Sequence, residues 1–160
     1  MAAATSAGDL ATAMAKANAT ASLAGADRQS YEAYLTTVLD VSQQSPETAG
    51  TAFKTLFARY SNIKSGKYTS DYNADDDTGE FESLNDVEAV LSKTGIKIRN
   101  SVSEFRNITD VFDEIASKWS SMSDVDRNAI ANALGGTRQR EQISILFENW
   151  DKVEEYKKIA

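Results

Sequence analysis

The sequence contains no cysteine and no histidine, and it has a single proline in 160 residues. Without cysteine there is no disulfide bond, no thiolate nucleophile and no thiolate metal ligand. Without histidine there is no imidazole acid or base, which excludes histidine-bearing catalytic triads and zinc clusters. These absences make an enzyme the poorer hypothesis, and we predict a protein with no enzymatic activity and no cofactor.

Long hydrophobic runs and an excess of basic charge are missing as well. No stretch approaches the roughly 20 apolar residues that cross a bilayer, so no membrane span is predicted. The 17 Lys and Arg residues are outnumbered by 24 Asp and Glu residues, for a net charge of -7. Phosphate contacts need Lys and Arg, so we predict no direct nucleic-acid binding. The hydrophobic content of 41% is that of a globular domain with a real core.

What the sequence does contain is helical periodicity along most of its length. The alanine-rich segment 1–26 predicts a helix that ends at Gly25 and whose small side chains let a neighbouring helix approach closely. Asp27 and the pair Ser45–Pro46 are typical of helix starts. We expect residues 1–26 to form a loose appendage and residues 27–160 to form a compact helical domain.

The middle of the chain departs from the helical pattern twice. Near residues 64–82, turn-forming and acidic residues replace any apolar period, which predicts a long acidic loop. Ser83 or Asn85 then begins a short helix. After it, the alternation of Ile96-Lys97-Ile98-Arg99 predicts a small β-hairpin near 96–106.

Capping residues place the last three helices. Thr109 is expected to cap the first of them. Ser123 begins the second, which ends at Gly135–Gly136, and Thr137 begins the third. The predicted fold is therefore mainly α, a compact multi-helix domain of about seven short helices with one hairpin. The side chains expected in its core, from the apolar stripes of these helices, are Phe53, Phe57, Phe112, Trp119, Leu146, Phe147 and Trp150.

The sharpest local pattern lies in the acidic loop. Oxygen-bearing side chains are spaced there as in an EF-hand calcium loop, and they are Asp71, Asn73, Asp75, Asp77 and Glu82. Two residues depart from that pattern, because Asp76 stands where the turn needs glycine and Thr78 where an apolar residue is usual. We therefore predict a solvated acidic turn rather than a metal site, with these five residues as the calcium candidate.

Two further groups of residues are weak site candidates. Asp110, Asp113 and Glu114 carry neighbouring carboxylates, but acid–base chemistry needs an apolar pocket that raises a carboxyl pKa, and acids in a first turn commonly face the helix dipole. Gly135–Gly136, followed by two arginines, offers backbone N–H groups to an anion. We favour a helix stop, a Thr137 cap and surface arginines as the explanation of this segment, and we predict no catalytic residues.

Several segments, taken in order, resemble a stretch of phage tail tape measure proteins. The similarity covers most of residues 45–155, and it rests on the ordered set rather than on any single motif. It is strongest over Ala129-Ile130-Ala131-Asn132-Ala133-Leu134-Gly135-Gly136-Thr137-Arg138-Gln139-Arg140-Glu141. The other segments that carry it are 51–60, 62–67, 84–91, 95–99, 104–106, 113–119 and 148–152.

The resemblance implies a structural role in the tail of a phage or prophage. Tape measure proteins are long, largely helical chains that occupy the tail lumen during assembly, set the tail length and leave when DNA is delivered. The implied partners are the tail tube protein, tail assembly chaperones, tail tip or baseplate proteins and further copies of the chain. The implied location is the host cytoplasm before assembly and the tail lumen of the virion afterwards. The chain is then expected to be a piece of a much longer protein.

Other hypotheses stay open from the residues themselves. A helical interaction module of another phage or cell-surface protein would bind its partner through the alanine-rich helix or the acidic loop. A third class is a hydrolase that uses carboxylates alone. A ruler works as an extended helix, at about 1.5 Å per residue, whereas glycines and a loop interrupt this chain. We therefore expect a compact module, with a radius of gyration of roughly 15 Å.

Overall fold

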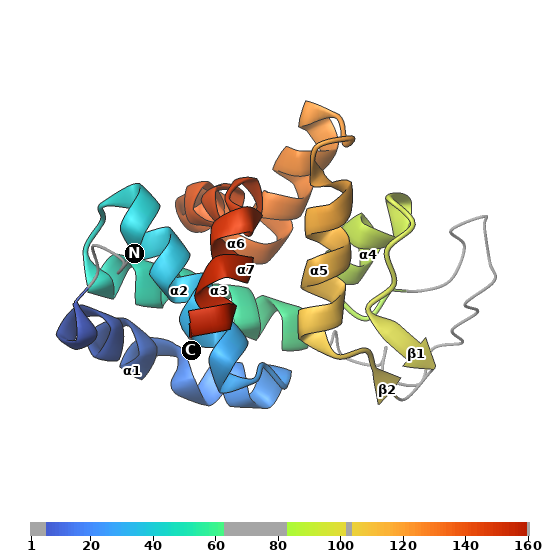
Figure 1. Cartoon of the computed structure of the whole chain (residues 1–160). Coiled ribbons are helices and arrows are strands. Elements are labelled where there is room, and N and C mark those ends of the chain that lie inside the picture. Colours follow the sequence, from blue (N-terminus) through green and yellow to red (C-terminus); the bar gives the residue numbers. More distant parts are fainter. Residues whose placement is uncertain (1–5, 63–82, 102–103, 160) are drawn as a thin grey trace.

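A computed structural model describes residues 6–62, 83–101 and 104–159 (Figure 1). This part of the chain is mainly α, with seven helices and one two-stranded antiparallel hairpin, which confirms the predicted fold class. The elements are α1 (Ala7–Ala24), α2 (Arg28–Ser42), α3 (Pro46–Ser61), α4 (Asp86–Lys93), β1 (Arg99–Ser101), β2 (Glu104–Phe105), α5 (Ile108–Trp119), α6 (Asp124–Glu148) and α7 (Trp150–Ile159).

The helices pack around a pair formed by α2 and α3. Helix α1 packs along α3, α7 packs against α2, and α6 contacts both members of the pair. Helix α4 packs on α6, and the hairpin lies beside α5 at the opposite end of the molecule from α1 (Figure 1). The first and last helices are thus docked on different members of the central pair.

Helix starts follow the local capping chemistry. The predicted caps Asp27, Ser45, Asn85 and Ser123 each accept a hydrogen bond from the backbone N–H three residues further on. Gly25 ends α1 in the left-handed conformation, with φ of 81°. These predictions are confirmed, and they needed only residues within one turn of each helix end.

The start of α5 corrects the prediction that Thr109 caps it. Asn107 is the cap, and its side-chain oxygen accepts hydrogen bonds from the backbone N–H and the hydroxyl of Thr109 at 2.9 and 2.6 Å. The helix therefore begins at Ile108, which is fully buried. The earlier start includes Ile108 on the same face as Val111 and Ile115, so packing decides between two caps that are two positions apart.

The last predicted helix is also corrected. The break at the glycine pair is confirmed at Gly136, whose φ of 72° and ψ of 179° interrupt α6. The helix expected from Thr137 onward, however, is divided at Asn149, where the backbone is again non-helical, and α7 begins at Trp150. No glycine or proline marks this second break. It allows α7 to turn onto α2.

The core is built around aromatic side chains. Phe112 contacts Tyr34 and Phe147, with ring centroids 5.6 and 5.5 Å apart. Of the predicted core residues, Trp150 is only half-buried. It lies at the start of α7, against the rings of Tyr34 and Phe147. The other predicted core residues are buried, and they are Phe53, Phe57, Phe112, Trp119, Leu146 and Phe147.

Small residues form the contact between α1 and α3. Ala13, Ala17 and Ala21 are buried along one face of α1. Opposite them, a methyl group added to Gly50 of α3 would lie 2.6 Å from the carbonyl oxygen of Ala13 and 2.8 Å from the Cβ of Lys16. The prediction of close approach is thereby confirmed, whereas the division of the chain after residue 26 stays a prediction.

Candidate functional site

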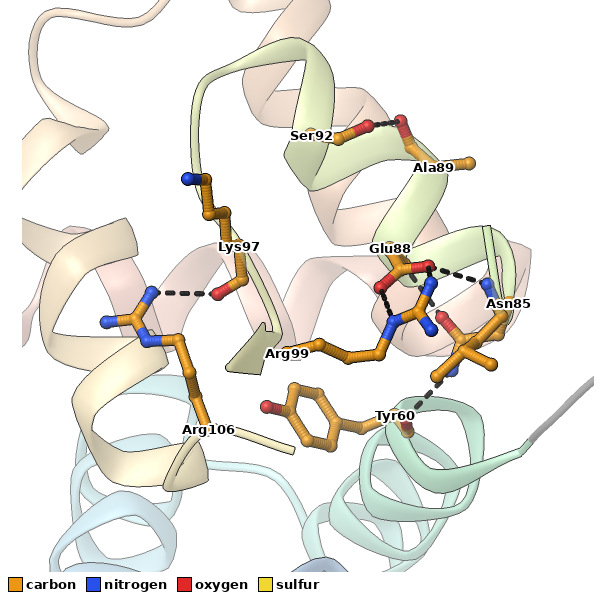
Figure 2. A network of polar contacts seen from close by, with 9 residues as sticks. Tyr60, Asn85, Glu88, Ala89, Ser92, Lys97, Arg99 and Arg106 are labelled. Atoms are coloured by element: carbon orange, nitrogen blue, oxygen red, sulfur yellow. Dashed lines mark hydrogen bonds and ion pairs between the residues drawn. The ribbon is translucent and has the colours of Figure 1, made fainter. Parts of the chain in front are cut away.

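A buried ion pair joins the first turn of α4 to the start of β1 (Figure 2). Arg99 donates from Nε to Glu88 Oε2 at 2.6 Å and from Nη2 to Glu88 Oε1 at 2.8 Å. The two side chains are 1% and 2% exposed. Two parallel charge-assisted bonds fix both the distance and the orientation of the partners.

Asn85, the cap of α4, extends this network to the end of α3 (Figure 2). Its amide nitrogen donates to the carbonyl oxygens of Tyr60 and Arg59 at 2.8 and 3.2 Å, and its amide oxygen accepts from the N–H of Glu88 at 2.8 Å. The N–H of Leu84 donates to Glu88 Oε1 at 2.6 Å. Carbonyls in the last turn of a helix lack partners within it, so Asn85 satisfies α3 while it starts α4.

The sequence prediction names Asn85 as a possible helix start and places Arg99 in the hairpin, but it assigns no site role to Glu88 or Arg99. The spacing Asn85-x-x-Glu88 is close to a capping box and would have found the glutamate. Alternation along the strand places Arg99 on the same side as Lys97, which is exposed. The two hydrogen bonds to Glu88 of α4 hold the guanidinium inward instead.

The chemistry of this network is that of a structural cross-link. The carboxylate of Glu88 already accepts three hydrogen bonds, from Arg99 and from a backbone N–H. A general acid or base must instead reach a proton of the substrate. The carboxylate joins α4 to the hairpin, and Asn85 joins α4 to α3, so we assign the network no catalytic role.

Glu114 is held by two cations on the surface of α5. It accepts from Arg106 Nη1 at 2.7 Å and from Lys118 Nζ at 3.2 Å. Burial alone would raise the pKa of Glu114, but the hydrogen bonds from Arg106 and Lys118 outweigh that effect and leave the pKa below its usual value. The carboxylate therefore stays ionised at neutral pH.

Asp110 and Asp113 occupy exposed positions on α5. Lys157 of α7 faces Asp113, with 3.9 Å between Nζ and Oδ1. Burial raises the pKa of Asp113, against the attraction of Lys157. Because Asp113 and Glu114 contact different cations, the structure does not bring them together as an acid–base pair.

Arg59 of α3 lies against the break in α6. A methyl group on Gly136 would lie 2.8 Å from Arg59 Nη2, and Arg59 Nη1 donates to the carbonyl of Ala133 at 3.5 Å. Arg138 and Arg140 are exposed after the break. The segment is therefore a helix break with surface arginines, as one of the two interpretations of its sequence predicts.

The five calcium-candidate residues lie outside the described residues: Asp71, Asn73, Asp75, Asp77 and Glu82. Across residues 6–62, 83–101 and 104–159, no three Asp, Glu, His or Cys side chains are grouped so that they could hold a metal ion. For the loop itself, the prediction of a solvated turn stays a prediction.

An open apolar hollow of about 630 Å³ lies between α1 and α2. Leu10, Met14 and Tyr31 contribute to its lining, and the Tyr31 hydroxyl donates to the Met14 carbonyl at 3.0 Å.

None of the helices in the described part of the chain has the length and apolar character to cross a membrane.

A comparison with known protein families gives a match over most of the chain. Residues 1–136 match the model of a family described as phage-related minor tail protein. The match runs from the N-terminus to the residue at which α6 is broken. No solved structure matches the chain.

Proposed function

The chain belongs to the phage-related minor tail protein family, and on this premise we propose that it is a segment of a tail tape measure protein. Membership gives the chain a structural role in the phage tail, as a virion-associated component that contacts other tail proteins. Tail-length determination and DNA delivery are the finer part of the proposal. The observation that carries it is the ordered resemblance over residues 45–155, together with the mainly helical fold.

The fold sets how much length such a segment would contribute. As one continuous helix, the 160 residues would span about 240 Å. Folded on a shared core, a chain of this size is roughly 40 Å across, from a radius of gyration of about 15 Å. The two states therefore predict clearly different changes in tail length.

Tail length after duplication of the segment tests the proposal. An in-frame duplication keeps every surface of the protein and adds one copy of the segment, and electron microscopy of the virions gives the length. We expect longer tails, by about 240 Å if the segment is extended in the lumen and by a few tens of Å if it stays folded. Tails that assemble at unchanged length would contradict the ruler and favour a non-enzymatic interaction module.

The proposed partners are the tail tube protein, the tail assembly chaperones, the tip or baseplate proteins and further copies of the chain. The proposed location is the host cytoplasm before assembly and the tail lumen afterwards. Lys16 and Lys54 are exposed and suit amine-reactive cross-linking. Cross-links from these lysines to the tube protein in intact virions are expected, and cross-links to capsid proteins alone would contradict the assignment.

We also propose that the segment has no enzymatic activity. Its support is the absence of cysteine and histidine and the use of Glu88 and Glu114 in ion pairs. A peptidoglycan zymogram of the purified chain should stay blank. A cleared zone would instead support the hydrolase that uses carboxylates alone.

A further inference from the structure

Helix α7 is attached to the rest of the protein with little apolar burial. Val153 is its one buried side chain, while Trp150 and Tyr156 are half-buried and Ile159 is 65% exposed. The second half of α6, directly before it, buries three large apolar side chains, which are Ile143, Leu146 and Phe147. The apolar contribution to stability therefore falls sharply after α6 ends.

Polar contacts hold α7 on α2 instead. The Tyr156 hydroxyl donates to Asp40 Oδ2 at 2.8 Å, and Lys152 Nζ lies 3.8 Å from the same oxygen. Gln29, near the start of α2, donates to the carbonyl oxygen of Lys157. Contacts of this kind at a partly wet surface each contribute little, because water replaces them when they break.

Lys157 fastens α7 to an aromatic surface. Its ammonium lies 5.7 Å from the ring centre of Tyr34 and 5.8 Å from that of Trp150, and it lies 3.9 Å from Asp113 of α5. Tyr34 is fully buried, and it also contacts Phe112. Removal of α7 would expose part of this aromatic cluster to water.

The junction between α6 and α7 would survive such a removal. Asn149 is non-helical, with φ of −118° and ψ of 35°, and its side chain donates to the carbonyl of Ile145 at 2.8 Å. Its backbone N–H bonds to the carbonyls of Ile145 and Leu146. The end of α6 is thus capped by Asn149, and α6 does not require α7 to satisfy these carbonyls.

We propose that α7 opens as a separate unit, swinging about Asn149 while the rest of the fold stays intact, and that opening uncovers the aromatic surface around Tyr34. The proposal concerns the isolated chain and does not depend on the tape measure role. Regions with few buried apolar contacts are those that open below the global unfolding free energy.

Native-state hydrogen exchange on the full chain tests this proposal. In the unmodified protein, amides of residues 153–158 in α7 should exchange at least about 100-fold faster than amides of residues 53–60 in α3. Asp40→Asn should accelerate exchange in α7 by about tenfold, because it weakens a hydrogen bond to a charged group. Glu155→Gln removes the same charge from an exposed position of α7 and should leave both rates within about twofold.

A substitution away from α7 separates local opening from global unfolding. Glu88→Gln weakens the core in both the closed and the open state, so it should accelerate exchange in α3 and leave α7 unchanged. Val87→Ala, at a buried position of the same helix, serves as a milder variant if the first does not fold. Acceleration of α7 and α3 by the same factor would show that α7 opens only with the whole protein, and would overturn the proposal.

Discussion

The two terminal helices are attached to the same central pair by opposite means. Helix α1 meets α3 through alanines, and Gly50 leaves no room there for a methyl group. Helix α7 meets α2 through half-buried side chains and through polar contacts to Asp40 and Gln29. The first attachment depends on shape, because close-packed surfaces do not accommodate extra volume. The second depends on charge and hydrogen bonding at a surface that water and salt can reach.

The comparison shows two ways to dock a helix with few fully buried large apolar side chains. Ala13 and Ala17 bury little area each, so close approach to α3 must supply the packing that larger side chains supply elsewhere. Helix α7 instead uses long side chains, such as Tyr156 and Lys157, to reach its partners. One attachment should fail with a single methyl group, and the other with a change of solution conditions.

The largest effect is expected where a polar contact is fully buried. This prediction tests whether the attachment of α7 is weak because its contacts are polar or because they are exposed to water. Glu88→Gln removes the carboxylate charge that faces the buried guanidinium of Arg99 and should lower the free energy of unfolding by about 3–5 kcal/mol. Urea denaturation followed by circular dichroism measures it. Glu32→Gln, in a pair whose Arg28 is 83% exposed, is the control and should cost at most about 1 kcal/mol. Equal losses of unfolding free energy in the two variants would show that burial does not set the strength of these polar contacts.

A methyl group on Gly50 should break the attachment of α1. Gly50→Ala places its Cβ against the backbone of Ala13 and should lower the free energy of unfolding by about 1–3 kcal/mol. In Gly8→Ala the new methyl meets only the Ser6 hydroxyl, at 3.9 Å, so this control should be neutral or stabilising, by at most about 1 kcal/mol. If Gly50→Ala unfolds at the same urea concentration as the unmodified protein, α1 is not packed as described.

Removal of one hydrogen bond should weaken α7 by a smaller amount. Tyr156→Phe keeps the ring but loses the bond to Asp40, at a cost of about 0.5–1.5 kcal/mol. Fluorescence of Trp150 in a Trp119→Phe background reports the release of α7 during urea denaturation. A mixed result, in which the circular dichroism midpoint moves but the Trp150 transition does not, would place the effect outside α7.

Alkaline pH should weaken the attachment of both terminal helices. Burial, with the hydrogen bond to Asp40, raises the pKa of Tyr156 to about 12, and burial also raises the pKa of Tyr31 beside α1. A folded pKa above the unfolded value of about 10 gives stability that is complete below pH 10 and is lost as the pH rises through the folded pKa. Both helices should therefore loosen above pH 10, and Tyr156→Phe should reduce the response of α7 in exchange measurements and leave that of α1 unchanged. An equal response in that variant would contradict the assignment.

Helix ends were predictable because the chemistry that sets them is local. Asp27, Ser45 and Ser123 each bond a backbone N–H three residues away, and Gly25 and Gly136 supply backbone angles that other residues rarely adopt. The buried site was only half predictable for the same reason. Asn85 and Glu88 lie within one turn of each other, whereas the partner that makes them a site is eleven positions further on.

The sequence by itself determined the mainly α class, most helix boundaries and membership of a phage tail family. Tertiary structure decided the remainder. It chose Asn107 over Thr109 as a cap, divided the last helix at Asn149, and left Trp150 half-buried. It also turned Arg99 inward, against the alternation of its strand. In each case the deciding neighbour lies on another element, and a free energy that depends on packing between elements cannot be read from spacing along one of them.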